Sequence, residues 1–89
     1  MGKSGIYFMK RAGPDLTAWL QQDPDVCKKI GDLLEDIQRH PYSGLGKPEL
    51  LKHDYQGWWS RRITGEHRLV YRVEDGTIYV LQCRGHYDN

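Results

Sequence analysis

The sequence predicts an α+β domain in which two N-terminal helices pack on one twisted, mostly antiparallel sheet. Apolar residues between positions 24 and 39 recur with the spacing of an amphipathic helix. After position 50 they form short runs rich in β-branched and aromatic residues. Helices followed by several strands are typical of α+β proteins. With 89 residues, the chain has the length of one domain, 1–89, in which we expect residues 1–5 to be flexible.

The N-terminal third predicts one strand and then a short helix. The apolar run 6–9 is rich in strand formers, so it predicts the first strand. Gly13-Pro14-Asp15 marks a helix start, because proline is tolerated in the first turn and an acid is favourable beside it. Leu16, Trp19 and Leu20 then fall on one face, which we expect to be buried.

A longer helix is predicted from Pro24 to about Arg39. Asp23 precedes it as the expected capping residue, and Pro41 ends it because proline disfavours helical geometry at the residue before it. The apolar positions of this helix share one face: Val26, Ile30, Leu33, Leu34 and Ile37.

The remaining chain predicts four strands separated by short turns, at about 50–53, 58–63, 68–73 and 77–84. Residues 78–81 are apolar on both strand faces, which favours a central position in the sheet. Trp58 and Trp59 must point to opposite faces, so one is expected in the core. The other either covers an interface or stacks a base, and we favour the interface.

Composition excludes several classes of protein. Hydrophobic residues make up 38% and charged residues 28%, as in an ordinary folded domain. No apolar run approaches the roughly 20 residues of a membrane span, and residues 1–20 lack the apolar core of a signal peptide. Cys27 and Cys83 are far apart, so we interpret them as buried thiols in a reducing cytoplasm. The histidines lack metal-ligand spacing, so we expect no metal or other cofactor.

The net charge of +1 is unevenly distributed. Residues 1–40 carry six basic and six acidic side chains, residues 41–72 carry six and three, and residues 73–89 carry one and three. The middle segment, at +3, also contains Trp and Tyr residues between its basic side chains. Such interleaving suits a phosphate backbone with bases to stack on. A local charge favours a positioned site over indiscriminate nucleic-acid binding.

Three residue types needed for RNA cleavage without a metal are present. Glu49 has the type required for a base, Arg62 and Arg68 for holding a phosphate, and His86 for an acid. Each also has a structural interpretation: a solvated loop acid, exposed strand arginines, and a histidine in a frayed tail. From the residues alone, the prediction stops at a small RNA-directed domain with or without catalytic activity.

The string KPELLKHDYQGWWSRRITGEHRLVY at 47–71, followed by His86-Tyr87, resembles the YoeB family. These are small toxins of the RelE superfamily from bacterial toxin–antitoxin modules. The resemblance implies a RelE-like toxin fold and a ribosome-dependent mRNA endonuclease that acts in the A site, uses no metal and inhibits translation. The implied partners are the ribosome, mRNA and a YefM-type antitoxin, in the cytoplasm and away from membranes.

The resemblance also implies the roles of seven residues. Catalytic roles pass to Glu49, Arg68, His86 and Tyr87, and RNA or phosphate binding passes to Lys47, Lys52 and Arg62. The alternative is a non-catalytic ribosome- or nucleic-acid-binding member of the same superfamily. Two adjacent tryptophans are hard to bury in 89 residues, so we also expect a homodimer of the free chain.

Overall fold

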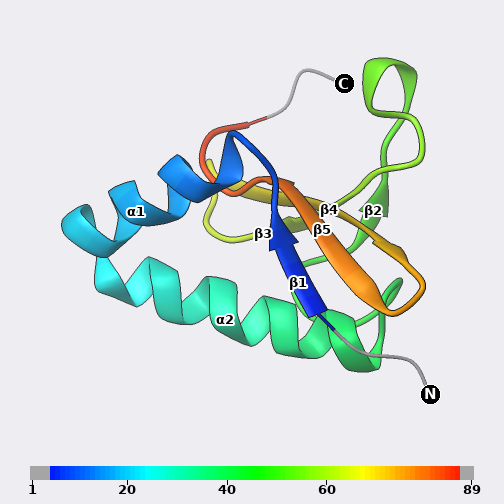
Figure 1. The fold of residues 1–89 in the computed structure, drawn as a ribbon, viewed down its shortest axis with the longest axis horizontal. Coiled ribbons are helices and arrows are strands. Elements are labelled where there is room, and N and C mark those ends of the chain that lie inside the picture. The colour runs from blue at the N-terminus through cyan, green and yellow to red at the C-terminus, as the bar shows by residue number, and fades with distance from the viewer. Residues whose placement is uncertain (1–4, 87–89) are drawn as a thin grey trace.

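The computed structural model describes residues 5–86 (Figure 1). This part of the chain contains helices α1 (Ala12–Gln22) and α2 (Pro24–Arg39) and the short 3₁₀ helix η1 (His53–Tyr55). Its strands are β1 (Gly5–Phe8), β2 (Glu49–Leu50), β3 (Trp59–Arg62), β4 (Arg68–Glu74) and β5 (Thr77–Gln82). The predicted order of helices and strands is confirmed. Of the segment expected to be flexible, Gly5 begins β1 and residues 1–4 lie outside the described residues.

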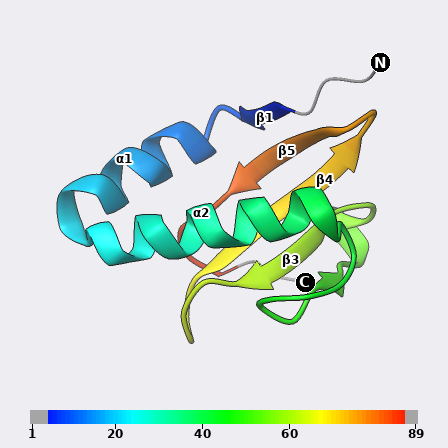
Figure 2. The same ribbon diagram turned by 90° about the horizontal axis from the view of Figure 1, so that it is seen from below.

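The strands of residues 5–86 form one sheet in the order β1-β5-β4-β3-β2. β1 pairs parallel with β5, whereas the pairs β5–β4, β4–β3 and β3–β2 are antiparallel, as predicted. β5 has a neighbour on each side, which agrees with its apolar residues on both faces. Figure 2 shows α2 lying across one face of this sheet.

The helices and the sheet meet in one apolar core. Five buried residues of α2 face the core, namely Val26, Ile30, Leu33, Leu34 and Ile37, as the helical spacing predicts. The sheet contributes Leu69 and Tyr71 from β4 and Ile78 and Val80 from β5. Burying one such aliphatic side chain stabilises a fold by about 1.5–3 kcal/mol, so this contact is a main source of stability.

Two expectations about the helices are wrong. Leu20 is 59% exposed, because the buried side of α1 runs through Ala12, Leu16 and Trp19 and the next residue is turned by about 100°. Asp23 makes no side-chain capping bond. It is the only residue between the helices, and its backbone serves both: its N–H donates to Trp19 O at 2.8 Å and its carbonyl accepts from the N–H of Val26 at 3.0 Å.

The strand expected at 50–53 is shorter and begins earlier. β2 pairs with β3 only at Glu49↔Ser60 and Leu50↔Trp59. The N–H of Leu51 still reaches Trp58 O at 2.9 Å, but His53 has a φ of 56° and turns the chain into η1. A left-handed residue cannot continue a strand, which is why the pairing stops here.

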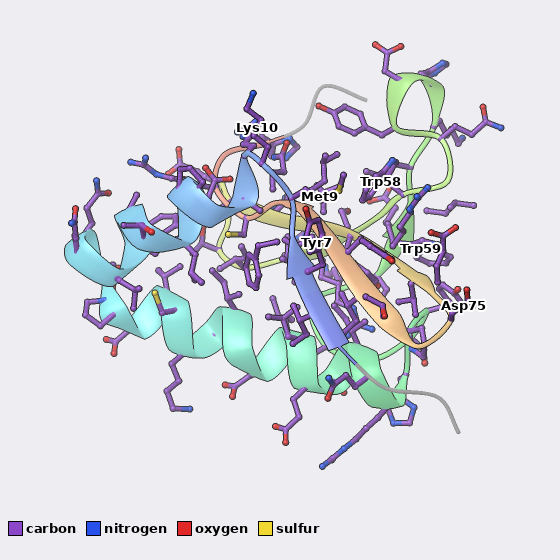
Figure 3. The ribbon with its side chains drawn as sticks, in the orientation of Figure 1. Tyr7, Met9, Lys10, Trp58, Trp59 and Asp75 are labelled. Carbon is purple, nitrogen blue, oxygen red and sulfur yellow. The ribbon has the colours of Figure 1, made fainter. Side chains whose placement is uncertain are left out.

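The two tryptophans point to opposite sides of the sheet, as predicted, and Figure 3 labels both. Trp59 packs against the helix-side core and lies 4.8 Å from the ring of Tyr42. The guanidinium of Arg72 lies over the ring of Trp58, with its Cζ 5.0 Å from the ring centroid. One tryptophan therefore belongs to the core, and the interface expected for the other stays a prediction.

Both cysteines are free thiols. Cys83 is buried, as expected, and burial raises its pKa to about 12. Cys27 is half-buried at the border of the core, so the expectation of burial holds for it only in part. None of the helices in residues 5–86 is long and apolar enough to cross a membrane.

Candidate active site

Strand register sets three of the predicted site residues on the same face of the sheet. Side chains alternate between faces along a strand, and directly paired residues share a face. Trp59, Tyr71 and Leu69 point to the helices. Their neighbours therefore point away, in two rows: Glu49–Ser60–Val70–Gln82 and, next to it, Arg62–Arg68. We call this side of the sheet the open face.

Arg68 is held in one orientation at the edge of the open face. It is only 8% exposed, and its Nη1 donates to the carbonyls of Thr64, Gly65 and His67 at 2.9, 3.2 and 3.2 Å. These bonds tie the guanidinium to the β3–β4 turn. The structural alternative, an exposed strand arginine, does not hold for Arg68, and its cation is preorganised by the turn it stabilises.

The chain after β5 brings His86 to Arg68. The backbone N–H of Arg68 donates to Gly85 O at 3.0 Å, and the N–H of Gly85 donates to Nδ1 of His67 at 2.8 Å. His86 is the next residue and is exposed. Gly85 has a φ of 89°, a conformation that glycine adopts without the strain of a side chain. In the order of the sheet, the backbone of Glu49 in β2 and the backbone that leads to His86 thus lie on opposite sides of Arg68.

Glu49 lies two strands away from Arg68, about 10 Å across the sheet, and is offset from it by two residues along the strands. It is exposed on β2, and Lys47 and Lys52 on either side of it are exposed as well. Lys47 has a φ of 53°. A non-glycine residue in this region costs about 1–3 kcal/mol and often marks a functional segment. The structure thus brings Glu49, both lysines and Arg62 to the same side of Arg68.

Arg61 was counted with the basic surface, and the structure corrects this. Its side chain is 0% exposed. It pairs with Asp36 and donates to Tyr71 Oη, and its guanidinium also donates to three loop carbonyls, those of His40, Ser43 and Leu45. The hydrogen bond from Arg61 holds the pKa of Asp36 below its usual value. Arg61 therefore stabilises the loop between α2 and β2.

That loop delivers Lys47 and Glu49 to the sheet. Tyr71 Oη donates to Pro41 O at 2.8 Å, and Arg62 N–H donates to Gly46 O at 2.7 Å. A Cβ on Gly46 would lie 3.0 Å from Arg62 O, so glycine permits this close approach. The double arginine of the sequence thus divides into a buried residue that shapes the site and an exposed one, Arg62, that faces it.

His67 was absent from the predicted site. It contacts the site through Gly85, and its ring packs on that of Trp19 in a T-shaped arrangement with a centroid distance of 4.7 Å. No sequence signal marks it, because its partners lie 18 and 48 positions away along the chain. Tyr87, predicted to support the site, lies outside the described residues. Within residues 5–86, no three His, Cys, Asp or Glu side chains are grouped to hold a metal ion.

Comparison with known proteins gives one consistent family. Residues 8–87 match the model of "YoeB-like toxin of bacterial type II toxin-antitoxin system". Toxin YoeB of Escherichia coli K12 is 51% identical over 82 residues, which cover 92% of this chain and 98% of the relative.

Solved structures agree with the sequence comparison. The YoeB/ParE toxin from Agrobacterium tumefaciens has a TM-score of 0.90 and 45% identity, covering 93% of this chain and 99% of the other. A heterotetrameric YoeB–YefM toxin–antitoxin complex from Staphylococcus aureus has a TM-score of 0.88 and 43% identity, covering 96% of this chain and 99% of the other. A YoeB dimer from the same organism has a TM-score of 0.89 and 44% identity, covering 94% of this chain and 98% of the other. The chain is therefore a member of the YoeB family, the toxins of bacterial type II toxin–antitoxin systems within the RelE superfamily.

Proposed function

We propose that this chain is a ribosome-dependent endoribonuclease that cuts mRNA in the A site. The observation that carries the proposal is the arrangement around Arg68. Glu49 and Arg62 lie on the open face to one side of it, and the Gly85 pairing brings His86 to the other. A base, a cation and an acid in this order fit the requirements of phosphodiester cleavage by an internal nucleophile.

The proposed reaction is a transesterification. Glu49 accepts the proton of the substrate's 2′-hydroxyl, and the 2′-oxygen forms a bond to the adjacent phosphorus. The bond from phosphorus to the 5′-oxygen breaks, and His86 donates a proton to that oxygen. The products are a 2′,3′-cyclic phosphate, which water opens to a 3′-phosphate, and a 5′-hydroxyl. Each acid or base contributes roughly 10²–10⁴ in rate.

Arg68 would stabilise the charge that builds on the phosphate. A guanidinium carries five N–H donors, so the three carbonyl contacts of Nη1 do not exhaust it. Its fixed orientation lowers the reorganisation needed in the transition state. Lys47, Lys52 and Arg62 are exposed cations beside Glu49 and would hold the RNA backbone. Tyr87 remains a proposed supporting residue of the same site.

Dependence on the ribosome follows from the small size of the open face. The 2′-oxygen, the phosphorus and the 5′-oxygen must be aligned for the reaction. Holding reacting groups in the correct orientation lowers the activation free energy by about 7–11 kcal/mol in favourable cases. A two-residue strand and the described segment between β5 and His86 offer little surface to bend an RNA strand into this geometry. The A site would supply the alignment, and we therefore propose the cytoplasm as the place of action.

A YefM-type antitoxin is the proposed inhibitor, because YefM accompanies YoeB in the S. aureus complex. An acidic antitoxin segment would cover Lys47, Lys52 and Arg62 and fold on binding. The charge available is smaller than the +3 counted from the sequence, since Arg61 is buried against Asp36. A dimer of the free chain is proposed by analogy with the S. aureus YoeB dimer.

Primer extension on mRNA from a reconstituted translation reaction tests the function. The expected result is discrete cuts at A-site positions when ribosomes are present, and little cutting of the same RNA without them. The downstream fragment should carry a 5′-hydroxyl, so it should accept radiolabelled phosphate from polynucleotide kinase without prior dephosphorylation. If translation stops while the mRNA stays intact, the non-catalytic binding alternative is correct instead.

A further inference from the structure

The segment Cys83–Gly85, directly before His86, is bonded along its backbone to distant parts of the chain. Figure 1 shows this segment, in red, passing beside the start of α1. The contacts are Cys83 N–H to Asp15 Oδ2 (3.1 Å), Trp19 Nε1–H to Cys83 O (2.8 Å), Arg11 Nη2 to Arg84 O (3.0 Å), Arg68 N–H to Gly85 O (3.0 Å) and Gly85 N–H to His67 Nδ1 (2.8 Å). We call this set of five bonds the tail clamp.

His67 accepts the hydrogen bond from the N–H of Gly85, the residue directly before His86. Accepting the Gly85 N–H requires Nδ1 to be unprotonated, so the proton of the neutral ring is on Nε2. Trp19 packs against the ring of His67 at 84° and donates its own N–H to Cys83 O. The ring therefore has a fixed tautomer and a fixed plane, and both are needed for this hydrogen bond.

The Gly85 amide decides where the next residue points. Gly85 O is fixed by Arg68 and Gly85 N–H by His67, so both ends of this residue are anchored at the β3–β4 turn. Without the His67 bond, the peptide between Arg84 and Gly85 would be held only by the bond from Arg11 Nη2 to Arg84 O. Its rotation would be less restricted, because glycine itself tolerates many values of φ. The position of His86 relative to Arg68 depends on this rotation.

We propose that His67 is a positioning residue for the cleavage reaction, which keeps the His86 imidazole beside Arg68 by accepting the Gly85 N–H. The inference rests on the proposed function and adds a residue to it. His67 does not exchange a proton with the substrate. A misplacement of about 1 Å costs up to roughly 10² in rate, so loss of this one bond should lower the cleavage rate by about 10- to 100-fold.

Two substitutions of His67 separate hydrogen bonding from packing. His67→Asn keeps an acceptor, because Asn Oδ1 is attached to Cγ as Nδ1 is in histidine, but it loses the ring that packs on Trp19. His67→Phe keeps a ring of similar shape and loses the acceptor. At a saturating concentration of ribosomes, the Asn variant should keep most of the single-turnover cleavage rate. The Phe variant should cleave about 10- to 100-fold more slowly. The ribosome concentration for half-maximal rate should change less than about 3-fold in both variants.

A backbone change tests the same bond without touching His67. Cys83 permits native chemical ligation of a synthetic segment 83–89 to a thioester of segment 1–82. Glycolic acid at position 85 replaces the N–H by an ester oxygen, and a ligated all-amide chain is the matched control. The ester should reproduce the loss seen with His67→Phe. Since the ester also weakens Arg84 O as an acceptor, Arg11→Gln serves as the control for that contact.

Amide hydrogen exchange at Gly85 follows the clamp independently of activity. Protection of the Gly85 N–H should be high in the wild type and in His67→Asn, and lower by about 10-fold or more in His67→Phe. Fast cutting by the Phe or ester chain, or a loss in the Asn variant larger than in the Phe variant, would overturn the proposal. A wild-type chain that cuts no mRNA overturns the proposed function instead, and the exchange data then still decide whether the clamp exists.

Discussion

The two faces of the sheet differ in what they contribute. The helix-side face is apolar, with Leu69, Tyr71 and Val80 at or near zero exposure beneath α1 and α2. The open face carries Glu49, Arg62 and Arg68, and none of them adds to that core. Stability should therefore depend mainly on the first face and cleavage on the second. Arg61 and Arg62, adjacent in β3, show the same division within two residues.

The largest effects should come from the open face and appear only in activity. Glu49→Gln and His86→Gln should each lower the single-turnover cleavage rate by roughly 10²–10⁴, because each removes a general base or acid while keeping the size of the side chain. Both residues are exposed, so the free energy of unfolding should change by less than about 0.5 kcal/mol. A rate loss that tracks a loss of stability would contradict the separation of the two faces.

The paired arginines sharpen the comparison. Arg61→Met removes a buried charge and leaves Asp36, Tyr71 Oη and three carbonyls without this donor, so it should destabilise the fold by about 3–5 kcal/mol. The matched variant Arg62→Met should stay within about 0.5 kcal/mol of the wild type and should weaken RNA cleavage. Urea unfolding followed by tryptophan fluorescence measures both. Equal losses of stability would show that Arg62 is structural too.

Two leucines test the helix-side face. Leu33→Ala should lower the free energy of unfolding by about 2–5 kcal/mol, since the Leu33 side chain is 0% exposed and its truncation leaves a cavity in the core. Leu20→Ala should cost less than about 0.5 kcal/mol, since that residue is 59% exposed. The measurement is the shift of the urea unfolding midpoint of each variant from that of the wild type, with the slope of unfolding free energy against urea concentration unchanged. A large effect at Leu20 would indicate that α1 packs on something else in solution, such as a second copy of the chain.

The smallest effect concerns pH. The pKa of Asp36 is lowered from 3.8, first by the hydrogen bond from Arg61. A carboxylate with a lowered folded pKa stabilises the fold above its unfolded pKa, and the contribution is lost as pH falls through the folded value. The stability difference between wild type and Asp36→Asn should therefore be largest at pH 6 and shrink toward pH 3. A difference that grows on acidification would contradict the role of this ion pair. Asp32→Asn, at an exposed pair with Lys28, is the matched control.

Sequence reasoning succeeded where the signal is local. The apolar period of α2, the proline at its start and the run of strand-forming residues at 68–73 each depend on neighbouring residues, and the observed bounds follow them closely. Glu49 and Arg68 were candidates from their residue types, and the resemblance to a family implied their catalytic roles. Their common side follows from strand register, which no single segment encodes.

The failures involve partners far apart in the chain. The side chain of Arg61 was assigned to the surface because its carboxylate, Asp36, lies 25 positions earlier. His67 gave no signal because Gly85 reaches it only after β4 and β5 have formed a hairpin. Charge and spacing identify which residues suit a site, whereas only the folded chain decides which of them face it.

Replacement of one hydroxyl in the substrate tests the central claim most directly. An mRNA with a single 2′-deoxy nucleotide on the 5′ side of the cut, loaded in the A site, should not be cut there, because the proposed nucleophile is absent. The all-ribose message should be cut at that position, and toxin binding to the two ribosome complexes should be equal. Cleavage of the deoxy message at the same phosphate would contradict the 2′-hydroxyl mechanism and the roles given to Glu49, Arg68 and His86.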